Sequence, residues 1–222
     1  MKRIFISDEI KTACPELIIA SIECSVINSA DSSKLWEEIN HLTEEIKNNS
    51  KLDEINRLPA ISATRIAYKT LGKDPNRYRP SAEALRRRII RELGLYKINT
   101  LVDIINYVSL KTGYSIGGFD ADKIEGDDIT LGVGTADDKF EAIGRGELNI
   151  EFLPVYRDFK GGVGTPTSDE ERTKIDINTK NILIIINAYS GNEGLNDAVQ
   201  LMKDMLQKYS FADNFNIWNS NE

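Results

Sequence analysis

The sequence predicts an α+β fold in a single domain, and three observations indicate it. Two segments rich in isoleucine and valine open the chain, amphipathic helical patterns follow, and a near-continuous apolar run, Ile182–Ile186, lies close to the end. Strands and helices in separate runs are typical of α+β proteins, whereas strict alternation is typical of parallel α/β sheets. No internal repeat or linker-like segment interrupts the 222 residues. We therefore expect residues 1–222 to form one unit.

The first two expected strands are Lys2–Ile6 and Leu17–Ile27, because β-branched residues recur there in partial alternation and Pro15 precedes the second run. From residue 31 the pattern changes to that of a helix ending near residue 50. Apolar residues are spaced four, three and four apart, which places them on one helical face. They are Leu35, Ile39, Leu42 and Ile46.

Three further helices are expected in the middle of the chain. The first ends near Leu71, where Gly72 stops it, and the second begins with Ser81 as its N-cap and ends at Gly94. The third covers residues 98–110 and is apolar on much of its circumference. A helix of that kind is expected to be largely buried.

The last part of the chain reads as short strands and turns after Gly126. The run Ile182–Ile186 lacks alternation, which is the mark of a central strand covered on both faces. A final amphipathic helix is expected over residues 194–212.

Composition excludes several classes of protein. The only cysteines are Cys14 and Cys24, and His41 is the single histidine, so neither a disulfide framework nor a metal or cofactor site is expected. The longest apolar run is far shorter than the ~20 residues of a membrane-spanning helix. We therefore expect a soluble, cytoplasmic protein with no association with membranes.

The net charge of −7 argues against a protein covered by nucleic acid, but the charge is unevenly distributed. Residues 73–97 hold eight basic and three acidic side chains, so the segment carries +5. Such segregation favours a local anion-binding face, with a solvated helix face as the alternative. The expected phosphate-binding residues are Arg79, Arg86, Arg87, Arg88 and Arg91.

Two other segments are candidates for ligand binding or catalysis. The pair Gly117-Gly118 before Phe119 reads as a turn that lines a pocket with backbone donors, although tight packing alone also explains it. The loop of residues 160–175 carries Thr165, Thr167 and Asp169, which could orient a water beside a carboxylate. It lacks the lysine and serine of a P-loop, and a mobile polar loop is the alternative.

Three stretches carry a resemblance to a known family. "RPSAEALRRRI", "GLYKINTLVDIINYVSLKTGYSIGGFDADKIEG" and "GGVGTPTSDEERTKIDINTKNILIIINA" resemble the central tRNA-binding and editing domain of the bacterial phenylalanyl-tRNA synthetase beta subunit. The likeness is closer still to free-standing proteins built on that domain. It covers Pro80–Ala188 and is strongest over Ile98–Gly126.

The resemblance implies a three-layer fold with an unusual β-sandwich flanked by helices. It also implies a pocket that, in the synthetase, hydrolyses tyrosine wrongly attached to the phenylalanine tRNA. The synthetase's editing histidine falls at Gly117 and its editing glutamate at or near Ile185, so the inherited polar groups are absent here. The two glycines are then expected to leave open space in the pocket, whose expected lining is Asn106, Gly117, Gly118, Phe119 and Asn187.

The leading hypothesis is a domain that binds the aminoacyl end of tRNA. Hydrolysis of mischarged tRNA in trans is left open, with Thr165, Thr167 and Asp169 as the catalytic candidates. The chain is not expected to be a synthetase by itself, because it has no matching ATP-binding motif. A non-catalytic sensor or carrier of a free amino acid is the alternative, and an interaction domain with a vestigial pocket is the third.

Overall fold

The structure is a computed structural model that describes residues 2–221. Its helices are, in chain order, α1 (Asp8–Ala13), α2 (Ser33–Asn49), α3 (Pro59–Leu71), α4 (Ser81–Ile90), α5 (Thr100–Thr112) and α6 (Leu195–Ser210). Its strands are β1 (Arg3–Ile6), β2 (Ile18–Ser25), β3 (Ile116–Asp120), β4 (Asp128–Val133), β5 (Glu141–Ala142), β6 (Gly146–Glu147), β7 (Pro154–Arg157), β8 (Gly162–Gly164), β9 (Asn181–Ala188) and β10 (Asp213–Asn219). Short 3-10 turns lie at Ile55–Arg57, Ala121–Lys123 and Glu171–Thr173.

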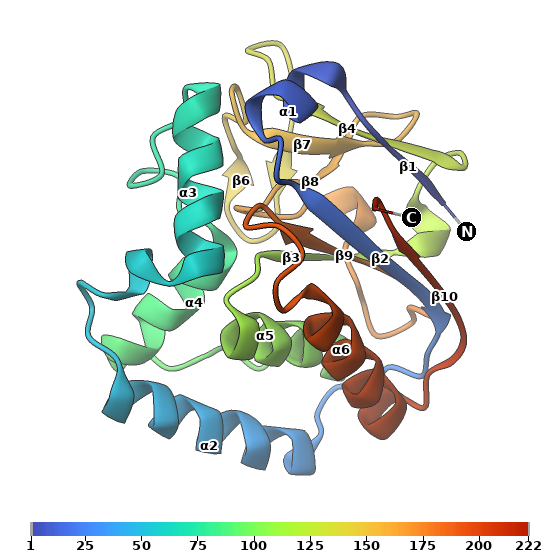
Figure 1. The fold of residues 1–222 in the computed structure, drawn as a ribbon. Helices are drawn as coiled ribbons and strands as arrows, with labels where there is room; N and C mark the ends of the chain where they lie inside the picture. Colours follow the sequence, from blue (N-terminus) through green and yellow to red (C-terminus); the bar gives the residue numbers. More distant parts are fainter. Residues whose placement is uncertain (1, 222) are drawn as a thin grey trace.

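The elements form three layers (Figure 1). A sheet of order β10-β2-β9-β3 lies in the middle, and α5 and α6 cover one of its faces. The second sheet, of order β1-β4-β7-β8, covers the other face and completes a β-sandwich. The α+β class and the three-layer arrangement expected from the sequence are therefore confirmed.

The centre of the middle sheet is apolar on both faces. Ile182, Ile184 and Ile186 of β9 pack in the cluster below the helices, while Leu183 and Ile185 pack against the second sheet. All five are completely buried. The expectation of a central strand covered on both faces is thus confirmed, and the reason is the absence of alternation in this run.

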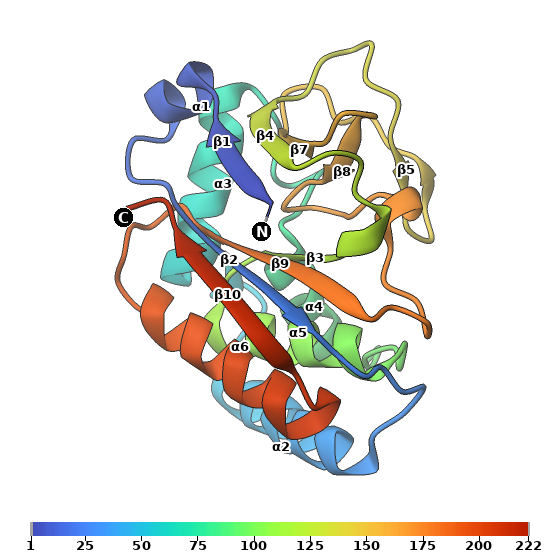
Figure 2. The same cartoon turned by 90° about the vertical axis from the view of Figure 1, so that its right-hand side faces the viewer.

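The strand pairing is antiparallel except between β1 and β4, which run parallel. Within residues 2–221, strand β10 pairs with β2 alone and forms one edge of the middle sheet, with α6 beside it (Figure 2). Strand β3 forms the opposite edge, next to β9. None of the helices in residues 2–221 is long and apolar enough to span a membrane.

Three elements were not expected from the sequence. Helix α1 is only six residues long, and β10 occupies part of the segment that follows the last helix. That helix ends at Ser210 because Phe211 adopts a left-handed conformation with φ of 50°. The third element is β3, which contains the glycine pair read as a turn.

Helix α4 was expected, but its bounds differ from the expectation. Its N-cap residue is Pro80 instead of Ser81, and its last residue is Ile90, before Gly94.

Candidate functional site

One cavity lies between α4, α5, β3 and the loop that follows β8. Its volume is about 410 Å³, and most of its wall is apolar, including Leu85, Val102, Ile105 and Ile175. A mostly apolar concavity with a few polar groups is the usual form of a small-molecule site. The polar side chains that line it include Asn106, Ser109, Thr165, Ser168, Asp169 and Lys174.

Asp169 is the carboxyl group in this lining. Its side chain is half-buried, and one oxygen, Oδ2, accepts a hydrogen bond from the backbone N–H of Gly118 at 3.2 Å. Burial raises the pKa of Asp169 to about 7, and the hydrogen bond from Gly118 only partly opposes that rise. Near neutral pH the group therefore exists in both protonation states, so it can accept or donate a proton.

The hydroxyl group of Thr165 shapes the loop that carries Asp169. Its Oγ1 accepts hydrogen bonds from the N–H groups of Thr167 and Ser168 at 3.2 and 3.0 Å, and it donates to the carbonyl of Ser168 at 3.0 Å. Thr167 does not line the cavity, because its hydroxyl is buried against that of Tyr68, 2.9 Å away. Of the three catalytic candidates, only Asp169 presents a group that can exchange protons with a ligand.

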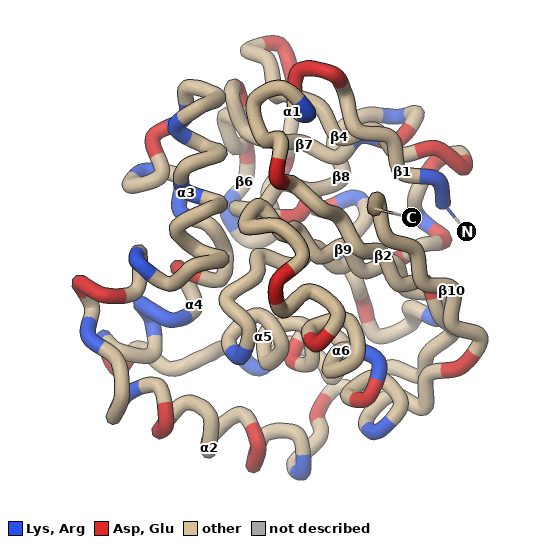
Figure 3. The backbone as a smooth tube through the Cα atoms, in the orientation of Figure 1, with Lys and Arg blue, Asp and Glu red and all other residues tan. Residues whose placement is uncertain are grey.

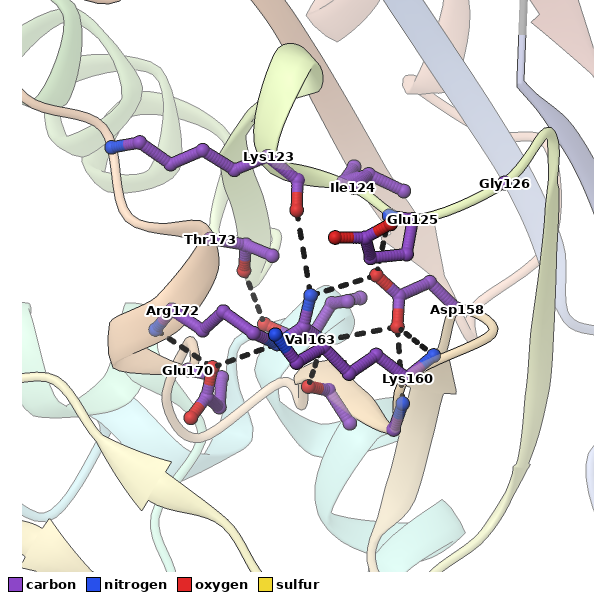
Figure 4. Close-up of polar contacts among 12 residues, drawn as sticks. Lys123, Ile124, Glu125, Gly126, Asp158, Lys160, Val163, Glu170, Arg172 and Thr173 are labelled. Carbon is purple, nitrogen blue, oxygen red and sulfur yellow. Dashed lines mark hydrogen bonds and ion pairs between the residues drawn. The ribbon is translucent and has the colours of Figure 1, made fainter.

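An ion pair holds the far part of the same loop (Figure 4). Arg172 donates to both oxygens of the buried Asp158 carboxylate, at 2.9 and 3.0 Å. The backbone N–H groups of Glu125, Lys160 and Gly161 also donate to Asp158. Burial tends to raise the pKa of Asp158, but the bonds from Arg172 and the backbone outweigh it and keep that pKa below its usual value. The loop is thus held by the hydrogen bonds of Thr165 in its first half and by the Arg172–Asp158 ion pair in its second half.

The glycine pair differs from the expectation of a turn with open space. Both residues belong to β3 and are buried. A Cβ on Gly117 would lie 2.8 Å from the ring of Phe119, and one on Gly118 would lie 2.3 Å from Cδ1 of Ile105. The space beside each glycine is therefore already occupied, so the expectation of open space was wrong, and tight packing explains the pair.

The expected pocket residues separate into two groups. Asn106 and Gly118 line the cavity, and the N–H of Gly118 serves as a backbone donor as expected. Gly117 and Phe119 point to the other face of β3, where Phe119 joins the core between the two sheets. Asn187 is also buried away from the cavity, since it accepts from the hydroxyl of Tyr156 and donates to the carbonyl of Ser115.

A second hollow, of about 250 Å³, lies beside α4, and we call it the arginine basin. Figure 3 shows basic residues gathered on and beside this helix. Four of the five expected arginines line the basin, but Arg86 lies elsewhere and donates to the carbonyl of Leu110 at the end of α5. The arginines of the basin are Arg77, Arg79, Arg87, Arg88, Arg91 and Arg145.

Buried Glu83 organises one wall of the basin. Its carboxylate accepts hydrogen bonds from Arg65 at 2.8 Å and from Arg87 at 2.7 Å. In residues 2–221, by contrast, Arg91 and Arg145 form no ion pair with a carboxylate. Unpaired guanidinium groups in a hollow attract anions, even on a protein whose net charge is negative. Sequence reasoning missed Arg145 because only the tertiary fold brings its hairpin to α4.

The described residues contain no cluster of side chains suited to bind a metal ion. Among the described residues, no group of three or more histidine, cysteine or acidic side chains is arranged to hold an ion. Both Cys14 and Cys24 are free and buried, and burial raises the pKa of each thiol.

Comparison with solved structures shows that the fold is similar to part of a phenylalanyl-tRNA synthetase beta subunit. The chain is similar to the crystal structure of an N-terminal fragment of the phenylalanyl-tRNA synthetase beta subunit from Pyrococcus horikoshii, with a TM-score of 0.51 and 14% sequence identity. The match covers 99% of this chain and 54% of the fragment. At this identity the likeness shows the fold alone.

The family follows from the sequence itself. A family model for the B3/4 domain matches residues 63–209, and the chain belongs to that family. It is also 30% identical, over 128 residues, to the phenylalanine–tRNA ligase beta subunit of Geobacter metallireducens. That match covers 57% of this chain and 15% of the ligase subunit, so this chain spans only a small part of its relative. The resemblance stated from the motifs is confirmed.

Proposed function

We propose that this B3/4 domain binds the aminoacyl end of a tRNA. The amino acid would lie in the cavity between α4, α5 and β3, which we call the Asp169 cavity, and backbone phosphates would lie over the arginine basin. One observation carries the proposal: the two hollows are built from the same elements. Helix α4 contributes Leu85 to the cavity and Arg87 to the basin, and the β5-β6 hairpin contributes Ile143 to the cavity and Arg145 to the basin. A ligand that joins an apolar group to a phosphate chain fits this arrangement.

Hydrogen bonds connect the loop of Asp169 to both of these elements. The N–H of Ser81, at the start of α4, donates to the carbonyl of Pro166 at 2.8 Å, and the N–H of Ile143 donates to the carbonyl of Asp169 at 3.1 Å. The carboxyl group and the basin are therefore held in one rigid frame. Such a frame supports recognition of a ligand that occupies both hollows at once.

The cavity also supports hydrolysis of the ester that joins an amino acid to ribose. Ionised Asp169 would take a proton from a water molecule while the water oxygen forms a bond to the ester carbonyl carbon. The bond from that carbon to the ribose oxygen then breaks, and the proton passes to this oxygen. The products are the free amino acid and a tRNA with a free hydroxyl group.

A second candidate function is binding of a free amino acid without hydrolysis. It is favoured by the packing at the two positions that the resemblance aligns with the synthetase's editing groups. Gly117 and Ile185 are direct partners across β3 and β9, and apolar side chains, including Phe119, fill the space around them. In that case Asp169 would pair with the amino group of the ligand instead of activating water.

The test is a deacylation assay with a panel of correctly and incorrectly charged tRNAs. The informative variant is Asp169→Asn, which keeps the side-chain shape and removes the ionisable group. The matched control is Asp137→Asn, because Asp137 is exposed and lies outside the cavity. Hydrolysis predicts release above the spontaneous rate that rises with pH as Asp169 ionises, and loss of that release in Asp169→Asn alone. Equal release by wild type and Asp169→Asn would reject the catalytic role.

Binding is measured in the same preparations so that the two candidate functions separate. A domain that binds charged tRNA but releases no amino acid would support the binding part of the proposal alone. A domain that binds free amino acids and shows no affinity for tRNA would support the second candidate and reject the first.

A further inference from the structure

The loop between α4 and α5 exposes three large apolar side chains in succession. Leu93, Tyr96 and Ile98 are 59%, 67% and 55% exposed. Leu93 lines the arginine basin, Ile98 lines the Asp169 cavity, and Tyr96 lies between them in the sequence. The loop therefore begins at the basin and reaches the cavity, and its exposed ring, Tyr96, contacts Arg88 of the basin. Grouped exposed apolar side chains of this kind are typical of binding surfaces.

Arg88 holds the ring of Tyr96 in place. The guanidinium carbon of Arg88 lies 4.2 Å from the ring centroid, which is a close cation–π contact. The same guanidinium donates to the carbonyls of Gly94 at 3.0 Å and Leu93 at 3.2 Å, so it is tied to the loop itself. The ring is thus supported on one face, while its high exposure leaves the rest of it accessible to a ligand.

The conformation of the loop is also fixed by its turn. Glu92 and Gly94 both adopt left-handed backbone conformations, with φ of 57° and 65°. The N–H of Leu93 donates to the carbonyl of Arg88 at 3.0 Å, which closes the end of α4. An aromatic ring that follows such a turn and contacts Arg88 loses little conformational freedom when a flat ligand stacks on it.

We propose that Tyr96 is a stacking platform for a nucleobase near the 3′ end of the bound RNA. This inference rests on the proposed function and names the subsite between its two hollows. A base joined to phosphates in the basin and to the aminoacyl ester in the cavity would lie next to this loop. Aromatic rings backed by arginine stack on any base, so the subsite selects single-stranded RNA without reading its sequence.

Charge favours RNA over a second copy of the chain as the occupant. The ring adjoins Arg88 and the basin, where Arg91 and Arg145 have no acidic partner in residues 2–221. The chain as a whole carries −7, so another copy would bring a mainly acidic surface but no ordered series of phosphates. A nucleotide chain offers both the flat group and the phosphates at adjacent positions.

The experiment compares two RNAs and three proteins. The probes are a single-stranded RNA of about eight nucleotides and the same RNA lacking its 3′-terminal base. The proteins are the wild type, Tyr96→Ala and Tyr96→Phe. Because Tyr96 is mostly exposed, all three are expected to fold, and thermal unfolding checks this.

Stacking predicts that wild type and Tyr96→Phe bind the complete RNA about 5- to 100-fold more tightly than the abasic RNA. Tyr96→Ala should bind both RNAs with the lower affinity, and the salt dependence should be the same for all three proteins because no charge has changed. This pattern would show that the additional affinity for the complete RNA comes from stacking of its 3′-terminal base on the ring at position 96.

Two results would overturn the inference. If wild type and Tyr96→Ala bind the complete RNA equally, Tyr96 is no platform, although the proposed binding of RNA would still stand. If no RNA binds, both proposals are rejected. Sedimentation of the same samples then shows whether Tyr96 instead supports association of two copies, which Tyr96→Ala would abolish.

Discussion

Asp169 gives a prediction about stability that does not depend on any ligand. Its pKa rises from 3.8 to about 7 in the folded domain, so between these values the folded state binds a proton that the unfolded chain has lost. Stability must therefore fall as pH rises through this window, by about 1.4 kcal/mol per pH unit. Above pH 7 the accumulated loss approaches about 4 kcal/mol as an upper limit, because the ionised carboxylate is held in an apolar cavity.

The variant Asp169→Asn removes this loss, since an amide does not ionise and can still accept the hydrogen bond from Gly118. We expect the variant to gain stability relative to wild type progressively from about pH 4 to 7, and to keep that gain at pH 8. Urea unfolding at four pH values measures the difference, and Asp137→Asn serves as the control. A difference between Asp169→Asn and wild type that stays constant across the range would show that burial does not shift this group.

Three further predictions concern the frame around the site. Gly164→Ala places a methyl group 2.6 Å from the ring of Phe119 and should destabilise the domain by about 1–3 kcal/mol in urea unfolding. Asp158→Ala removes the carboxylate that accepts two hydrogen bonds from the mostly buried Arg172 and leaves Glu170, at 3.7 Å, as its carboxylate partner in residues 2–221, so it should cost about 3 kcal/mol, with faster proteolysis of the loop as a second readout. Replacing both Arg91 and Arg145 by alanine should weaken tRNA binding and flatten its salt dependence, whereas replacing the exposed Lys160 and Lys180 should not.

The sequence predicted the parts of the fold whose patterns are local. The run Ile182–Ile186 identified the central strand, and the apolar spacing in residues 31–50 identified α2. Strand β3 was missed because a glycine pair reads as a turn when only neighbours in sequence are considered. It becomes a strand through its pairing with β9 and the packing of Ile105 and Phe119 over the two glycines.

For the candidate site, too, the sequence indicated the segments involved but not the direction of their side chains. Thr165, Thr167 and Asp169 were proposed together because they lie in a polar loop that leads into a buried strand. The direction of each side chain was not visible from the sequence, so Thr167, which contacts Tyr68, was grouped with residues of the cavity. Four arginines of one helix segment were found from local charge, but Arg145 comes from a hairpin more than fifty residues away and needed the tertiary fold.

The β5-β6 hairpin is a short segment that contributes to both the cavity and the arginine basin. Its two strands are two residues each, and its turn supplies both Ile143 and Arg145. It is attached to the Asp169 loop through the N–H of Ile143, which donates to the carbonyl of Asp169, and through the bridge between Ala142 and Glu170. A few substitutions in this turn would change the shape of the cavity and the charge of the basin together, while both sheets stay intact. One short surface segment therefore couples the lining of the cavity to the charge of the basin.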